Sequence, residues 1–234
     1  MKALLVDLDD TLLDYSGGVD ECWAGACRVV EHGVDHATLL EALVEARRWF
    51  WSDPLRHRRE RVDRLGAWRK IVEEALRRCG RPLTDGIALP IAEDYAARRR
   101  EAMRLFPDAI ASLERLRGAG VRLALVTNGD ARQQRDKIER HGLARFFEVM
   151  VIEGEFGAGK PDEVVYRAAL EGVRSRPAEA WMVGDHLEFD VAGPQRLGVH
   201  GVWIDRAGSG LPVASGVRPD RIIRALTELE IPPR

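Results

Sequence analysis

The sequence has few cysteines, no long apolar run and no large excess of either charge. Its three cysteines, Cys22, Cys27 and Cys79, lack the spacing of a zinc site or a redox pair, which favours a reducing cytoplasm. No apolar run reaches the roughly 18 residues of a membrane-spanning helix, and the apolar stretch before Asp7 is too short for a signal peptide. The formal net charge of −2 gives no indication of a nucleic-acid partner. We therefore expect a cytoplasmic protein without a membrane or nucleic-acid partner.

What is present is a globular composition, with 234 residues, 45% hydrophobic and 32% charged. Short runs rich in branched apolar residues predict five buried parallel strands: Ala3–Val6, Leu123–Val126, Val149–Ile152, Trp181–Val183 and Val199–Ile204. Helical patterns occur between or beside the later strands: Ala109–Arg117, Val164–Leu170 and Val191–Leu197. This alternation predicts an α/β fold with a doubly wound parallel sheet.

The interval from Tyr15 to Phe106 breaks this alternation and contains no convincing strand. It carries four helical patterns: Glu21–Glu31, Thr38–Trp51, Arg61–Cys79 and Ile87–Arg104. A connection of this length is far too long for an ordinary crossover between parallel strands. The sequence therefore predicts a Rossmann-like core of residues 1–14 and 107–234, with an all-helical cap domain inserted at residues 15–106.

Two carboxylates follow the first predicted strand, in Asp7-Leu8-Asp9-Asp10-Thr11. Alternation along an extended chain puts Asp7 and Asp9 on the same side. Such a pair needs a shared proton or a cation, and magnesium suits oxygen ligands. The alternative is an acidic turn that caps the next helix.

Two further clusters suit an anion. Thr127-Asn128-Gly129 ends the second apolar strand and offers a hydroxyl and backbone N–H groups, although Asn-Gly is also a common turn. Lys160 precedes Pro161, which we expect at the first position of a helix. A cation at a helix N-terminus is unfavourable unless an anion lies nearby, which favours a functional lysine.

The fourth apolar strand ends in Gly184-Asp185, and Asp190 follows five residues later. These acidic residues predict a divalent-ion site, while His186 between them is expected to face solvent. In open α/β sheets ligands bind outside the carboxyl ends of the strands. We therefore expect all four clusters to converge on one crevice.

The ordered motifs Asp-x-Asp-x-Thr, Thr-Asn-Gly, Lys-Pro and Gly-Asp-x-x-x-x-Asp resemble those of the haloacid dehalogenase-like hydrolase superfamily. The resemblance covers essentially the whole chain, and the helical insertion resembles the cap of subfamily I. Residues 133–137 and the Trp-Ser-Asp-Pro stretch are similar to members near the acylneuraminate-9-phosphatases and nucleotide phosphatases.

The resemblance assigns the catalytic roles. Asp7 matches the nucleophile, and Asp9 matches the general acid and base. Thr127 and Lys160 match the groups that hold the phosphoryl oxygens, and Asn128 adds a backbone N–H.

The resemblance also assigns a magnesium site. Its ligands are Asp7, the backbone carbonyl of Asp9 and Asp185, and Asp190 is a further ligand or supports the others. Dehalogenases of the superfamily lack an acid at the position of Asp9, because halide leaves without a proton, whereas an alkoxide benefits from one.

The activity implied is that of a magnesium-dependent phosphatase acting on a small phosphorylated metabolite, as a monomer or homodimer. A phosphomutase of the same superfamily is the alternative. A receiver-like regulatory protein without turnover is an alternative from another class.

The predicted cap is basic around its middle. Residues 41–80 hold eleven Arg and Lys against seven Asp and Glu, an excess of four positive charges. We expect one or two of Arg47, Trp51 and Arg56 to select the substrate through its charge or ring. The alternative is a solvated helical face with ordinary ion pairs.

Overall fold

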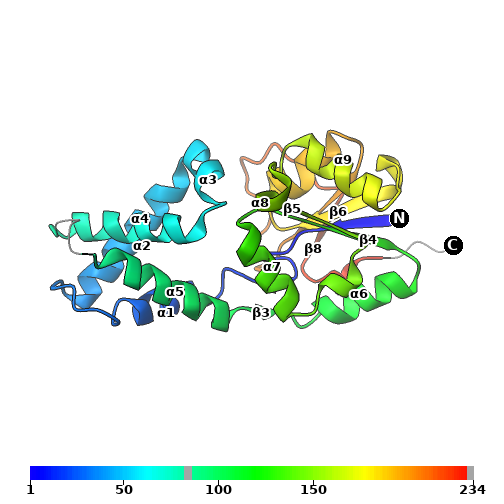
Figure 1. Ribbon diagram of the computed structural model, residues 1–234. Helices are drawn as coiled ribbons and strands as arrows, with labels where there is room; N and C mark the ends of the chain where they lie inside the picture. The colour runs from blue at the N-terminus through cyan, green and yellow to red at the C-terminus, as the bar shows by residue number, and fades with distance from the viewer. Residues whose placement is uncertain (82–85, 231–234) are drawn as a thin grey trace. The chain divides into compact units, whose positions relative to one another are not determined.

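The structure is a computed structural model that describes residues 1–81 and 86–230, and it divides into two compact units (Figure 1). Met1–Tyr15 and the chain from Arg104 onward form the core unit, and Ser16–Met103 form the helical unit. The strands β2 (Leu13–Asp14) and β3 (Arg104–Leu105) pair antiparallel in the core unit. Arg104 was predicted to be the last residue of a helix, and that prediction is wrong because Arg104 and Leu105 extend to pair with β2.

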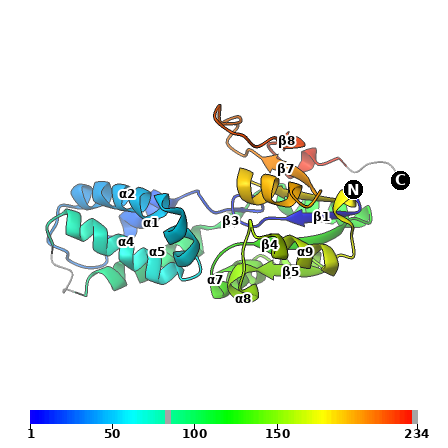
Figure 2. The same cartoon turned by 90° about the horizontal axis from the view of Figure 1, so that it is seen from above.

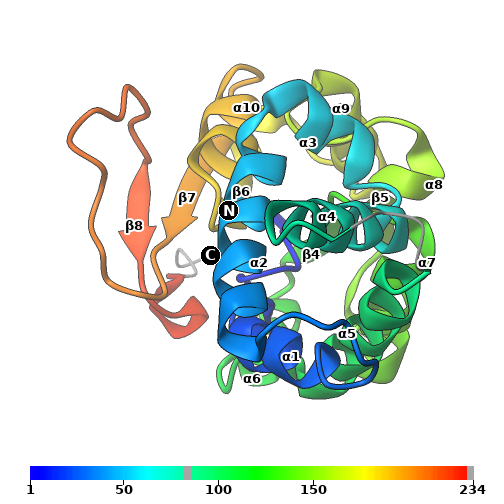
Figure 3. The ribbon, with the colours of Figure 1, turned by 90° about the vertical axis from the view of Figure 1, so that its left-hand side faces the viewer.

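The core unit is built on a six-stranded parallel sheet in the order β5-β4-β1-β6-β7-β8. The strands are β1 (Ala3–Val6), β4 (Arg122–Thr127), β5 (Val149–Ile152), β6 (Ala180–Gly184), β7 (His200–Ile204) and β8 (Arg221–Ile223). The five predicted strands and the doubly wound fold are confirmed. The sequence missed β8, which is short, largely uncovered and lies at the edge beside β7 (Figure 3).

Helices and turns connect these strands. They are α6 (Ala109–Gly118), α7 (Ala131–Arg140), η1 (Ala144–Phe146), α8 (Glu153–Phe156), α9 (Glu163–Gly172), η2 (Pro177–Glu179), the π-helix η3 (Leu187–Ala192), α10 (Gly193–Gln195) and η4 (Leu226–Glu228). Helix α9 packs its buried face, including Val165, Tyr166 and Ala169, against β1, β4 and β5. Strands buried on both faces read as continuous apolar runs, which explains why β1 was visible in the sequence.

Two predicted helix positions in the core unit are wrong. Pro161 lies outside α9, because a turn in which the Asp162 N–H donates to the Gly159 carbonyl precedes the helix. The predicted helix Val191–Leu197 is the end of η3 followed by α10. Pro194 has no N–H to continue a regular helix from the preceding turn, and it lies in the first turn of the short helix α10.

The helical unit consists of α1 (Val19–Ala26), α2 (His36–Ser52), α3 (Pro54–Glu60), α4 (Arg64–Arg78) and α5 (Ala88–Ala102) (Figure 2). Its core includes Trp23 stacked on Tyr95 at 3.6 Å between ring centroids, with Trp68 edge-on to Tyr95 at 5.1 Å. The sequence missed α3 as a separate helix. Asp53 ends α2 and caps α3 by accepting from the Arg56 N–H, and Pro54 opens the new helix. Within the described part of the chain, no helix has both the length and the apolarity to cross a membrane.

Candidate active site

The register of the central strands brings three of the predicted polar clusters to one edge of the sheet. Val6 of β1 lies opposite Leu125 of β4 and Val183 of β6. The Asp7 N–H extends this pairing by donating to the Val183 carbonyl at 3.0 Å. Thr127 at the end of β4 and Asp185 just after β6 therefore flank Asp7, as expected at the carboxyl ends of parallel strands.

A buried lysine links the first, third and fourth clusters. Lys160 Nζ lies 2.6 Å from Asp7 Oδ1 and 2.7 Å from Asp190 Oδ1, and its side chain is only 2% exposed. Burial alone would lower the pKa of Lys160, but the carboxylates of Asp190 and Asp7 outweigh it and raise that pKa. The ammonium group therefore stays charged beside Asp7.

When fully ionised, the acidic residues carry more negative charge than Lys160 compensates. Burial raises the pKa of Asp7 to about 7, against the lowering effect of Lys160. Burial, followed by the charges of Asp7 and Asp190, raises the pKa of Asp185 to about 9. When the three carboxylates are ionised, they and Lys160 carry a net charge of −2, which a divalent cation would balance.

The carboxylates also have the spacing of a metal site. One oxygen from each of Asp7, Asp185 and Asp190 lies within 4.8 Å of the others. Magnesium–oxygen bonds of about 2.1 Å put opposite ligands about 4.2 Å apart, so these residues fit magnesium. Asp190 Oδ1 already accepts from Lys160, and its Oδ2 accepts from the His186 N–H at 3.0 Å. Asp190 therefore holds Lys160 in addition to contributing an oxygen to this cluster.

Asp9 is held by helix α7. Lys137 Nζ lies 2.8 Å from each carboxylate oxygen of Asp9, and Gln134 Nε2 donates to Oδ2 at 3.2 Å. The same amide group donates to Thr127 Oγ1 at 2.6 Å. Neither Gln134 nor Lys137 was predicted from the sequence to take part in the site. Their spacing of three residues, which puts both on one face of a helix, was the available signal.

Asn128 and Glu153 fix the loops that carry Thr127 and Lys160. The Asn128 amide donates to the Lys160 carbonyl at 2.8 Å, and its Oδ1 accepts from the Lys160 N–H at 2.7 Å. Glu153, which is buried, accepts from the Gly129 N–H at 2.8 Å. The side chain of Asn128 thus joins the two loops, and the sequence did not predict this role or that of Glu153.

Thr11, the last residue of the first motif, also contacts Asp7. Its hydroxyl donates to Asp7 Oδ2 at 3.1 Å and is fully buried. Because Lys160 contacts Oδ1, both oxygens of Asp7 are oriented by neighbouring side chains.

The three predicted substrate-selecting residues lie in the helical unit. Arg47 pairs with Asp20 at 2.7 Å, and Trp51 lies edge-on to Phe50. Arg56 donates to the carbonyls of Phe50 and Trp49 at the end of α2. Their role in substrate selection stays a prediction.

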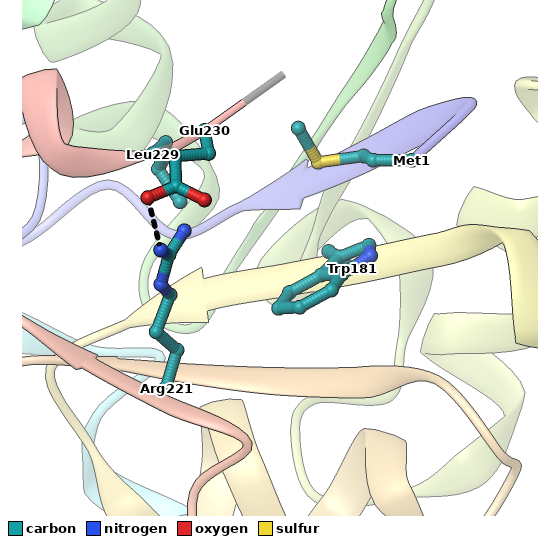
Figure 4. A pocket seen from close by; sticks show the side chains of 5 residues that line it. All are labelled: Met1, Trp181, Arg221, Leu229 and Glu230. Carbon is teal, nitrogen blue, oxygen red and sulfur yellow. Dashed lines mark ion pairs between the residues drawn. The ribbon is translucent and has the colours of Figure 1, made fainter. Parts of the chain in front are cut away.

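A separate hollow of about 210 Å³ lies in the core unit away from these carboxylates (Figure 4). It is lined by Met1, Trp181, Arg221, Leu229 and Glu230, and Arg221 pairs with Glu230 at 2.6 Å. Met1 and Trp181 mark the amino ends of β1 and β6, whereas the acidic cluster follows their carboxyl ends.

A doubly wound sheet with carboxylates, a lysine and a threonine at the carboxyl ends of its central strands is typical of α/β enzymes acting on phosphate groups. The chain belongs to the haloacid dehalogenase (HAD)-like hydrolases, whose family model, "haloacid dehalogenase-like hydrolase", matches residues 1–198. The predicted family is confirmed.

Individual relatives agree with this assignment. The chain is 35% identical to a phosphoserine phosphatase of Thermus thermophilus, over 94% of this chain and 91% of the relative. It is 28% identical to the N-acylneuraminate-9-phosphatase of Rattus norvegicus, over 98% of this chain and 92% of that relative. The HAD-hydrolase YfnB of Bacillus subtilis shares the fold, with a TM-score of 0.74 and 19% identity over 97% of this chain and 96% of that one. The chain is accordingly a HAD-type phosphatase, a phosphoric monoester hydrolase, as predicted.

Proposed function

We propose that the protein hydrolyses a small phosphate monoester in a magnesium-dependent reaction, with a phosphoryl group carried transiently on Asp7. The observation that carries this proposal is the Asp7 carboxylate, which is buried, oriented by Lys160 and Thr11, and close to two further carboxylates. Asp7 and Asp185 would hold magnesium, with the backbone carbonyl of Asp9. When bound, the metal supplies positive charge to the phosphoryl oxygens and aligns them with Asp7.

In the first step an Asp7 carboxylate oxygen attacks phosphorus, and the bond from phosphorus to the ester oxygen breaks. Asp9 gives a proton to the departing oxygen, which leaves as an alcohol. Lys160 and the Thr127 hydroxyl stabilise the charge on the phosphoryl oxygens. Thr127 Oγ1 accepts from Gln134, so its own hydroxyl hydrogen is available to donate to phosphate.

In the second step Asp9, now a carboxylate, takes a proton from water while the water oxygen attacks phosphorus. The bond between phosphorus and Asp7 breaks, which releases phosphate and restores the Asp7 carboxylate. Splitting the hydrolysis into two displacements lets one pair of aspartates serve both halves.

The test measures phosphate release from a panel of esters, including phosphoserine and N-acylneuraminate 9-phosphate, with magnesium and with a chelator. We expect release from a few related esters, at least about 100-fold slower with the chelator. Asp7→Asn should lose activity while remaining folded. Full activity in Asp7→Asn, or in the presence of the chelator, would overturn the proposal.

A further inference from the structure

The Asp9 carboxylate accepts hydrogen bonds from two side chains of helix α7, which lies far from it in the sequence. Asp9 Oδ2 accepts two bonds, from Lys137 Nζ at 2.8 Å and from Gln134 Nε2 at 3.2 Å. Asp9 Oδ1 accepts one, from Lys137 at 2.8 Å. A carboxylate oxygen has two lone pairs, so Oδ1 keeps one for a proton while the side chain stays held.

Gln134 and Lys137 are both buried, which indicates that their side chains are held in fixed positions beside Asp9. Gln134 is 2% exposed and Lys137 is 5% exposed, although the other long polar side chains of this helix are half-buried or exposed. Burying an ammonium or an amide is unfavourable unless its hydrogen bonds are satisfied. Lys137 meets that requirement with Asp9 and with Gln134 Oε1 at 2.7 Å, and its Nζ lies 4.4 Å from the centre of the Tyr15 ring.

Gln134 extends the contact to the phosphate-binding side of the site. Its amide donates to Asp9 Oδ2, to Thr127 Oγ1 and to the Asn128 carbonyl. Asp130 caps α7 by accepting from the Gln133 N–H at 2.8 Å, so the start of the helix is fixed directly after β4. One helix therefore sets the position of Asp9 relative to Thr127.

We propose that Lys137, supported by Gln134, is a positioning residue that holds Asp9 for proton transfer to the leaving oxygen. This inference rests on the proposed function of Asp9. Proton transfer in a transition state depends steeply on the position of the donor, and a displacement of 1 Å can cost about 100-fold in rate. Lys137 acts through Asp9 and does not itself need to touch the substrate.

The test exploits leaving groups of different basicity. An alkyl phosphate needs a proton on its leaving oxygen, whereas the leaving oxygen of p-nitrophenyl phosphate departs readily without one. The ratio kcat/KM reports phosphoryl transfer to Asp7 and excludes the later hydrolysis of the intermediate. For Lys137→Met we expect kcat/KM to fall about 10- to 100-fold on the best alkyl phosphate and less than about 3-fold on p-nitrophenyl phosphate. Lys137→Arg should recover part of the loss.

The matched control is Arg140→Met, which removes one positive charge from the same helix at a more exposed position. It should leave kcat/KM unchanged on both substrates.

A double-mutant cycle adds a readout that a merely structural role would not produce. If Lys137 acts through Asp9, Lys137→Met should cause little further loss on the alkyl phosphate in an Asp9→Asn background.

Three results would overturn the inference: equal losses on both substrates, no loss on either, or losses that multiply in the double variant. If Lys137→Met does not fold, Lys137→Gln serves in the same comparison. Comparing wild type with Asp9→Asn tests the proposed role of Asp9 independently of Lys137. If wild type and Asp9→Asn differ strongly on the alkyl phosphate and little on p-nitrophenyl phosphate, the role of Asp9 stands whatever Lys137 does.

Discussion

Gly184, the last residue of β6, lies so close to Asp190 that a larger residue there would displace the Asp190 carboxylate. A Cβ atom added there would lie 2.2 Å from Asp190 Cγ, 2.3 Å from Oδ2 and 2.6 Å from Cβ. Ordinary contacts of this kind are about 3.4 Å or longer. Asp190 must therefore move by about 1 Å in Gly184→Ala, although its oxygens hold Lys160 and the His186 N–H.

We expect this overpacking to cost about 1–3 kcal/mol of unfolding free energy. In a chain of 234 residues that corresponds to a fall in Tm of about 2–12 °C. Because Asp190 orients Lys160, kcat should fall about 100-fold. The assays are thermal unfolding and phosphate release from the best ester of the panel.

Gly118→Ala is the matched control, because a Cβ at Gly118 would meet nothing within 4 Å in the described structure. Gly118 is the last residue of α6, so alanine should leave the unfolding free energy within about 1 kcal/mol and kcat unchanged. If Gly184→Ala matched wild type in both Tm and kcat, the close packing of Asp190 against β6 would not be needed for the site.

Three further predictions concern charge. Lys160→Met leaves Asp7 and Asp190 without their buried partner, so it should lower the unfolding free energy of the metal-free protein by about 3–5 kcal/mol, measured by urea unfolding; an unchanged midpoint would contradict this. Burial raises the pKa of Asp7 to about 7 and that of Asp185 to about 9, so the folded state binds more protons than the unfolded state above the ordinary aspartate pKa. The metal-free protein should therefore lose stability as the pH rises toward 9, and the rise in Tm with magnesium should grow over this range and be largely absent in Asp185→Asn. Alanine at Arg47, Trp51 and Arg56 together should change the relative rates across the ester panel, and unchanged ratios would remove these residues from substrate selection.

The sequence predicted the strands that are buried on both faces of the sheet, and the site residues that lie at or just after their carboxyl ends. β1 and β4 are continuous apolar runs, and their carboxyl ends carry Asp7 and Thr127, so strand position alone indicated where these residues would meet. β8 and α3 were missed for different reasons. β8 is an edge strand of only three residues, too short for its two isoleucines to form an apolar run, and α3 follows α2 with only Asp53 between them.

The contacts around Asp9 lay beyond sequence reasoning for a different reason. Gln134 and Lys137 belong to a highly polar helix, where such side chains normally face solvent. Only the tertiary placement of α7, whose Gln134 donates to Thr127 at the end of β4, turns them toward Asp9, and placement of that kind leaves no periodic apolar signal. The assignment of Lys160 to a helix N-terminus failed similarly, because the turn from Gly159 to Asp162 separates it from α9.

The most direct test of the central claim is to trap the intermediate. The protein is mixed with magnesium and its best ester, quenched in acid during turnover, digested and analysed by mass spectrometry. We predict a phosphoryl group on the peptide that contains Asp7, absent in Asp7→Asn and absent with a chelator. Rapid turnover with no phosphorylated peptide, or with the phosphoryl group on another residue, would contradict nucleophilic attack by Asp7.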